Sequence, residues 1–238
     1  MPTLRIVLVE PQEAGNVGAV ARAMKNFGFD DLVVVGNHPP LLPVAGWWAS
    51  GADDLLARAR FAPTLQAAVA DAHLTVATTS MRGRTAPADF TPFSLAEHFA
   101  GDQRIALVFG REDSGLTRDE LALCQRTAVI PTNEHFPTMN LAQAVCVFCF
   151  ALSQIAPREA SRALAPAALV ERMHERLESL LLQSGFLHAN NPARIYDDIR
   201  AIFGRASLDT REATILLGIV HQLEWAISSR ESDSGTRR

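Results

Sequence analysis

Short apolar runs alternate with amphipathic stretches through the first two thirds of the chain. Runs of Val, Ile and Leu bounded by polar or glycine residues predict buried strands, which fall at residues 4–9, 32–35, 60–62, 74–78, 105–109 and 128–131. Apolar residues three and four apart predict helices, which fall at residues 16–27, 52–58, 64–71, 94–100, 117–124 and 141–155. This alternation is typical of a mostly parallel sheet with helices on both faces, so the predicted fold class is α/β.

The pattern changes near residue 156. Residues 157–168 are rich in Ala, Pro and Arg and predict a linker, and only helical periodicity follows, at residues 166–184, 192–203 and 210–229. We therefore divide the chain into an α/β domain (1–156), a linker (157–168), a helical extension (169–230) and a polar tail expected to be disordered (231–238).

Two predicted helix starts have the capping-box spacing, in which each of two residues three apart accepts a hydrogen bond on its side chain from the backbone N–H of the other. These are Ser94 with Glu97, and Thr117 with Glu120. Both pairs are predicted to fix the first turn of a helix.

Composition narrows the class of protein. The 238 residues are 48% hydrophobic and 20% charged, which excludes a disordered chain. A formal net charge of −4 excludes a polybasic nucleic-acid coat protein, although clustered arginines could still bind nucleic acid. Three cysteines suit a reducing compartment, and no apolar run approaches the roughly 20 residues that span a membrane. We expect a soluble cytoplasmic protein with no membrane partner.

The first candidate for chemistry is a turn that enters a helix after the first strand, Gly15-Asn16-Val17-Gly18. Free N–H groups at such a turn can bind an anion. The dinucleotide fingerprint is incomplete, and Gly36 stands where that fingerprint has an acidic residue, so NAD binding is disfavoured. Asn16 is either the helix N-cap or a site residue, and Arg22 either forms a surface or interface salt bridge or serves the site.

Two further loops follow strands and precede helices. The segment Gly110-Arg111-Glu112-Asp113-Ser114-Gly115 lies where the loops of a parallel sheet bind ligands, and its glycines let the backbone approach closely. A loop with merely solvated charges is an equal alternative. The segment Pro137-Thr138-Met139-Asn140 precedes an apolar helix, and capping explains Thr138 or Asn140 but not both.

Weaker features point less clearly to chemistry. Arg82 and Arg84 lie on the loop after the fourth strand, where they either contact phosphate or are simply solvated. Cys146 and Cys149 have a metal-ligand spacing, but they lie in an apolar helix without a second ligand pair, which favours core packing. No metal site is expected.

Together the three motifs resemble those of the SpoU-type branch of the SPOUT RNA 2′-O-ribose methyltransferases. The matching residues are Asn16 and Arg22, then Gly110, Arg111, Glu112, Gly115 and Leu116, then Thr138, Asn140 and Leu141. The tail, with Ser184-Gly185-Phe186 and Ile199-Arg200, is similar to a subgroup that methylates cytidine or uridine at nucleotide 32 of the tRNA anticodon loop.

The resemblance implies properties that the residue pattern does not show. It implies a trefoil knot in the C-terminal part of the α/β domain, a homodimer, tRNA rather than DNA as partner, and S-adenosyl-L-methionine as co-substrate without a metal. The catalytic residues implied are Arg22, Asn16, Glu112 and Asn140, of which the last three shape the site. The cofactor-binding residues implied are Thr79, Ser80, Met81, Gly110, Ile130, Pro137, Thr138 and Met139. We expect Arg82, Arg84 and Arg111 to hold the RNA backbone.

The chemistry assigns Arg22 an electrostatic role. A guanidinium has a pKa above about 12 and is a poor base, so we expect Arg22 to stabilise developing oxyanion charge, through an RNA phosphate that helps take the proton. Thr138 replaces the usual serine of the family and keeps its hydroxyl, whereas Pro137 removes one backbone N–H.

Three alternatives remain open at this stage. The first keeps the chemistry and changes the substrate to ribosomal RNA. The second is a catalytically silent RNA-binding protein on the same fold. The third is a nucleotide-binding oxidoreductase, which the incomplete fingerprint disfavours.

Overall fold

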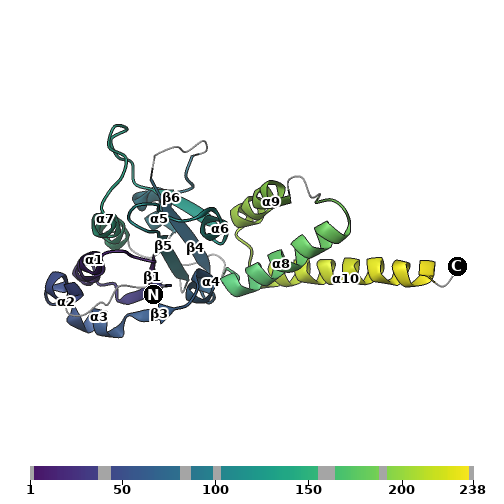
Figure 1. The fold of residues 1–238 in the computed structure, drawn as a ribbon, viewed down its shortest axis with the longest axis horizontal. Coiled ribbons are helices and arrows are strands. Elements are labelled where there is room, and N and C mark those ends of the chain that lie inside the picture. The colour runs from purple at the N-terminus through teal and green to yellow at the C-terminus, as the bar shows by residue number, and fades with distance from the viewer. Residues whose placement is uncertain are drawn as a thin grey trace.

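The computed structural model describes residues 3–36, 44–80, 87–98, 103–154, 164–187 and 192–235. Figure 1 shows an α/β unit with a helical unit beside it, from which the last helix extends. Six strands form one sheet: β1 (Thr3–Val9), β2 (Asp31–Val35), β3 (Arg60–Ala62), β4 (Leu74–Thr79), β5 (Arg104–Phe109) and β6 (Arg126–Val129). Each of the five pairings between them is parallel, so the predicted α/β class is confirmed.

The strand order determines which loops meet. The order is β3-β2-β1-β5-β4-β6, so β5 lies between β1 and β4 although both precede it in the chain. Because the strands are parallel, the loops that follow β1, β5, β4 and β6 leave the same edge of the sheet. The second and third sequence motifs lie on such loops, and the first lies in the opening turns of α1 (Ala14–Asn26), the helix that follows β1.

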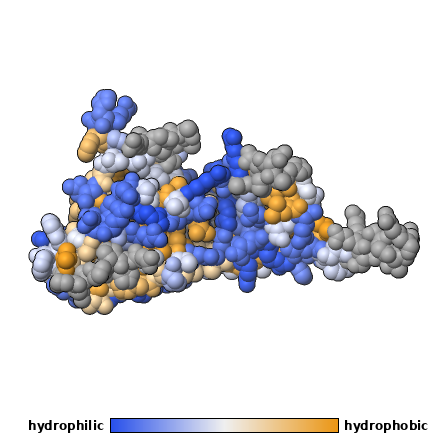
Figure 2. Space-filling view, in the orientation of Figure 1, coloured by the Kyte–Doolittle hydropathy of each residue, from blue (hydrophilic) through white to orange (hydrophobic). Residues whose placement is uncertain are grey.

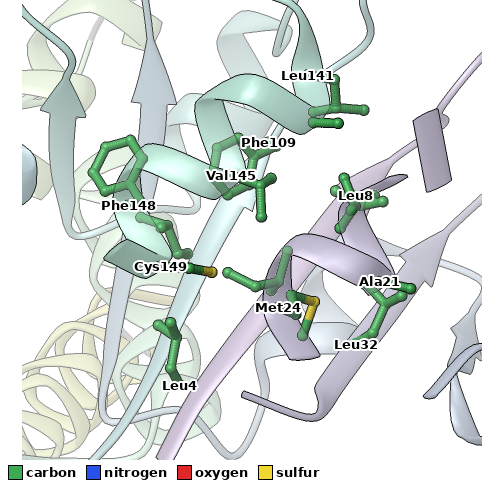
Figure 3. Close-up of a cluster of buried hydrophobic side chains, with 14 of the residues drawn as sticks. Leu4, Leu8, Ala21, Met24, Leu32, Phe109, Leu141, Val145, Phe148 and Cys149 are labelled. Atoms are coloured by element: carbon green, nitrogen blue, oxygen red, sulfur yellow. The ribbon is translucent and has the colours of Figure 1, made fainter. Parts of the chain in front are cut away.

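Helices cover both faces of the sheet: α1 (Ala14–Asn26), α2 (Val44–Ala49), α3 (Asp53–Arg58), α4 (Leu65–Val69), α5 (Pro92–His98), α6 (Arg118–Ala122) and α7 (Leu141–Ser153). Alternate strand residues point to opposite faces. Ile6 and Leu8 pack with α1 and α7, whereas Val7 and Val9 pack with α4. Figure 3 shows the larger cluster, in which Met24 and Phe148 are fully buried. Each such side chain contributes roughly 1.5–3 kcal/mol by leaving water.

Helix α2 was not predicted, and it explains the glycines of the first motif. A Cβ on Gly18 would lie 2.0 Å from the Ala45 carbonyl oxygen, so only glycine lets α2 cross α1 at this distance. A Cβ on Gly15 would lie 3.1 Å from Nε1 of the Trp48 indole, a tighter contact than most side chains make. Gly18 therefore serves helix packing, a role that the sequence pattern did not indicate.

Two predicted helix starts were wrong. Helix α1 begins at Ala14 with Glu13 as N-cap, so Asn16 lies inside the first turn and does not cap it. Helix α5 begins at Pro92, and the reciprocal pair is Thr91 with Ser94 rather than Ser94 with Glu97: each backbone N–H donates to the other hydroxyl, at 2.8 and 3.3 Å. The Thr117–Glu120 capping box of α6 is confirmed.

The helical unit contains α8 (Ala167–Gln183), α9 (Pro192–Ala206) and α10 (Thr210–Gly235). It is attached to the α/β unit by backbone bonds, because the Ala167 N–H donates to the Ala72 carbonyl at 2.7 Å. Helix α10 continues to Gly235, so the tail expected to be disordered from residue 231 is helical to that point. Most of the predicted linker lies outside the described residues. The visible face of both units is largely hydrophilic with scattered apolar patches (Figure 2).

Membrane and metal features were sought in the described part of the chain. No helix there is long and apolar enough to cross a membrane. Nor does any group of three or more His, Cys, Asp or Glu side chains lie together in these residues as metal ligands. Cys149 is buried in the core, and burial raises the pKa of its thiol to about 12, which fits a packing role.

Candidate functional site

A cavity of about 530 Å³ opens at the carboxyl ends of β4, β5 and β6. Three loops line it: the end of β4, the loop from β5 to α6, and the loop from β6 to α7. Its size lies within the range of small-molecule sites in proteins. The topology therefore joins the second and third motifs in one concave site.

The structure brings the sequence-predicted cofactor residues to this cavity. Those that line it are Thr79, Ser80, Gly110, Ile130, Pro137, Thr138 and Met139. Met81 lies outside the described residues, as do Arg82 and Arg84. The lining combines apolar side chains with polar backbone, which suits a ligand that has both a flat apolar part and hydrogen-bonding groups.

The Gly110–Gly115 turn is shaped by its glycines. A Cβ on Gly110 would lie 2.2 Å from the carbonyl carbon of Gly115, and Gly115 has a φ of +70°. Arg111 and Gly115 exchange two backbone bonds, at 3.1 and 2.9 Å, which close the turn. The backbone of this tight turn therefore forms part of the cavity wall.

The loop from β6 to α7 is closed by a side chain. The Thr132 hydroxyl donates to the Pro137 carbonyl at 3.1 Å. Asn140 caps α7, because its side-chain oxygen accepts from the N–H groups of Ala142 and Gln143 at 2.9 and 3.3 Å. Capping therefore accounts for Asn140, whereas Thr138 lines the cavity.

Asn16, Glu112 and Asn140 form one hydrogen-bonded chain beside the cavity. The Asn16 amide donates to Glu112 Oε1 at 2.8 Å, and the Asn140 amide donates to Asn16 Oδ1 at 3.0 Å. Glu112 also accepts from the N–H groups of Gln12 and Glu13, at 2.9 and 3.3 Å. With three N–H donors on one carboxylate, Glu112 ties the first turn of α1 to the Gly110–Gly115 turn. Its role here is to fix the orientation of Asn16.

Arg22 is not joined to this chain. It lies further along α1 with an exposed side chain, and it makes no hydrogen bond or ion pair with another residue in the described ranges. It does not line the cavity either. Of the four residues implied as catalytic, three therefore meet within this chain, and Arg22 does not join them.

Arg111 has a different set of contacts from the one expected. Instead of facing solvent, its guanidinium binds Glu120 through two bonds of 3.0 Å and Glu10 through a bond of 2.8 Å. These carboxylates hold the pKa of Arg111 above its usual range, Glu120 most strongly. Sequence reasoning missed both partners as site residues. Glu120 carried a capping signal only, and Glu10 carried none.

Comparisons with known proteins agree with this geometry. Residues 3–150 match the family described as the SpoU rRNA methylase family, and residues 168–234 match the C-terminal domain of the tRNA methyltransferase TrmJ. The uncharacterized tRNA/rRNA methyltransferase LasT of Escherichia coli is 36% identical over 228 residues, covering 93% of this chain and 97% of LasT. The tRNA (cytidine/uridine-2′-O-)-methyltransferase TrmJ of Salmonella typhimurium is 37% identical over 241 residues, covering 94% and 97%. The crystal structure of TrmJ from Zymomonas mobilis is 34% identical, with a TM-score of 0.83, and covers 93% of this chain and 99% of that one.

Proposed function

Because the chain belongs to the SpoU rRNA methylase family, we propose that it transfers a methyl group from S-adenosyl-L-methionine to a ribose 2′-hydroxyl of tRNA, at cytidine or uridine 32 of the anticodon loop. The observation that carries the proposal is the convergence of the second and third motifs on one cavity, with the Asn16–Glu112–Asn140 chain beside it. The C-terminal match to TrmJ favours tRNA over ribosomal RNA.

The donor, once bound, supplies a methyl group on a sulfonium, which is already activated and requires no metal. The cavity residues would hold the adenosine and amino-acid parts of the donor through loop backbone, chiefly around Gly110 and Ile130. The remaining requirement is placement of the ribose oxygen in line with the methyl carbon, at about 3 Å. The loops from β5 to α6 and from β6 to α7 supply that positioning, because the first is closed by the Arg111–Gly115 backbone bonds and the second by the Thr132–Pro137 bond.

Asn16 and Asn140 would contact the RNA. Each amide has two N–H groups and uses one within the hydrogen-bonded chain. The second N–H of each is a donor for a ribose or phosphate oxygen. Because Glu112 fixes Asn16 and the first turn of α7 fixes Asn140, these donors are oriented before substrate arrives.

Arg22 would complete the site from a second subunit. Among the described residues it makes no bond with the hydrogen-bonded chain of its own subunit, whereas its exposed position on α1 is accessible to a partner. A homodimer, which the family resemblance implies, would place one guanidinium at each site, where it would stabilise oxyanion charge through an RNA phosphate. The same resemblance implies the trefoil knot, and we include that threading in the proposal.

The decisive experiment uses purified protein, methyl-labelled S-adenosyl-L-methionine, and unmodified tRNA and rRNA in parallel, with the label mapped by nuclease digestion. We expect label on the ribose of nucleotide 32, lost in Arg22→Ala. Label only in rRNA would overturn the substrate and keep the chemistry. Donor binding without label in either RNA would favour a silent RNA-binding protein.

Subunit mixing tests the origin of Arg22. Arg22→Ala and Asn140→Ala would each be inactive as homodimers. Mixed dimers contain one site with both residues intact if Arg22 acts across the interface. Activity recovered on mixing supports this arrangement, whereas mixed dimers that form without activity contradict it.

A further inference from the structure

Arg111, Glu10 and Glu120 form a compact ion cluster at the root of the Gly110–Gly115 turn. Arg111 and Glu120 side chains are each 17% exposed, and the guanidinium binds Glu120 through both of its terminal nitrogens. Its third nitrogen donates to Glu10, and one terminal nitrogen also donates to the Gly115 carbonyl at 3.3 Å. A planar fork engaged on two sides has little freedom to reach a nucleic-acid phosphate.

Glu10 adopts an unusual backbone conformation to make this contact. Its φ is +44°, a region that side chains other than glycine rarely adopt. The Glu10 N–H is held by the Val35 carbonyl at 2.9 Å, and Gly36 leaves room for its side chain, since a Cβ there would lie 2.7 Å from Glu10 Cγ. Strain that the surroundings maintain is a feature of functional positions. Here it directs a carboxylate at Arg111.

Glu120 joins the cluster to the start of α6. Its Oε2 accepts from the Thr117 N–H at 2.7 Å in the capping box and from Arg111 at 3.0 Å. Arg111 is thus held from two elements, the end of β1 through Glu10 and the first turn of α6 through Glu120. Its two neighbours in the chain are Gly110, which lines the cavity, and Glu112, which holds Asn16.

We propose that Glu10, Arg111 and Glu120 form a clamp that holds the Gly110–Gly115 turn in the shape that receives the methyl donor. Arg111 is then a positioning residue for donor binding, in place of the RNA contact that its sequence position suggests. The proposal rests on the proposed function, because it assumes that the cavity takes S-adenosyl-L-methionine.

The test compares Glu10→Gln and Arg111→Lys with wild-type protein. Glu10→Gln keeps the size of the side chain and removes its negative charge. Arg111→Lys keeps the positive charge and removes the planar guanidinium that binds Glu10 and Glu120 together. Arg58→Gln is the matched control, since Arg58 forms an exposed ion pair with Asp54 on α3, outside the cavity lining. The readouts are the dissociation constant of S-adenosylhomocysteine by calorimetry, the KM for donor, and the salt dependence of the KM for tRNA.

If the clamp holds the turn, the variants should bind the methyl donor more weakly, and the salt dependence of tRNA binding should not change. We expect affinity for S-adenosylhomocysteine to fall about tenfold in either variant, as for loss of one charge-assisted bond, and not in Arg58→Gln. The combined variant Glu10→Gln/Arg111→Gln should bind the donor no worse than Arg111→Gln alone, because both changes remove the same contact. The salt slope of tRNA binding should stay at the wild-type value in all of them.

Two results would overturn the clamp. One is wild-type donor affinity in both Glu10→Gln and Arg111→Lys. The other is a salt slope reduced by about 0.7 in Arg111→Gln, which would show a direct phosphate contact. Circular dichroism checks that each variant is folded, and Arg111→Lys remains informative if Glu10→Gln is not. Failure of wild-type protein to bind S-adenosylhomocysteine would overturn the proposed function itself, and the clamp's stated purpose with it.

Discussion

Asn140 has two separable roles, and a pair of substitutions should distinguish them. Its side-chain oxygen caps α7 through the N–H groups of Ala142 and Gln143, and its side-chain nitrogen donates to Asn16 at 3.0 Å. Asn140→Ala removes both roles. Asn140→Asp keeps an oxygen for the cap and removes the donor.

The expected magnitudes follow from these contacts. Loss of an N-cap costs about 1 kcal/mol, and loss of the exposed hydrogen bond to Asn16 costs up to a further ~1 kcal/mol, so Asn140→Ala should be destabilised by up to about 2 kcal/mol. For a chain of this size, that lowers Tm by roughly 4–8 °C. In Asn140→Asp, the carboxylate gains about 0.3–1 kcal/mol from the helix N-terminus, which offsets much of the lost bond to Asn16. Its stability should therefore stay within about 1 kcal/mol of wild type.

Activity should separate from stability in the same pair. Asn140→Asp places an acceptor against Asn16 Oδ1 and removes the donor proposed for the RNA, so methyl transfer should fall at least about tenfold although the fold is intact. Thermal melts and methyl-transfer rates measure the two effects. Asn133→Ala is the control, because Asn133 makes a local bond to the His135 N–H in the same loop. Full activity in Asn140→Asp, or a loss of stability equal to that of Asn140→Ala, would refute the reasoning.

Three further changes test the packing and the ionisation of the fold. Gly18→Ala should destabilise the protein by about 1–3 kcal/mol in urea titrations, because the new Cβ meets the Ala45 carbonyl. Gly218→Ala, at an exposed position of α10, is the control and should stabilise the protein by ~0.5–1 kcal/mol. Equal effects of the two substitutions would contradict the α1–α2 contact. Burial lowers the pKa of His174 to about 4, so on acidification the histidine of the unfolded chain takes up a proton before that of the folded chain. The free energy of unfolding should therefore fall by an amount on the order of 3 kcal/mol as the pH drops from about 6.5 to 4. A His174→Gln variant with the same pH profile would refute this. The bond from Arg5 lowers the pKa of Asp71, so its contribution should be present above pH ~4 and lost in more acidic solution; acid titration of Asp71→Asn should lack that step.

The sequence by itself determined the local features of the fold. Apolar runs and helical spacing are set by neighbouring residues, so all six strands were located, as was the capping box of Thr117 and Glu120. The three motifs could also be placed after strands of a parallel sheet, and their resemblance to a known family supplied the expected roles. Short α2, where aromatic residues lie beside glycine and alanine without a clear period, carried too little local signal.

Only the tertiary structure decided which side chains meet. The partners of Asn16 are 96 and 124 residues away, and those of Arg111 include Glu10, 101 residues away. The strand order brings these loops together. A polar side chain there could cap a helix, face solvent or serve catalysis, and the residues around it in the fold determine which of these it does. Asn16 thus lies within a hydrogen-bonded chain, and Arg111 is paired with Glu10 and Glu120. Local pattern could not decide either assignment, because the energy that decides it comes from contacts that exist only after the sheet has formed.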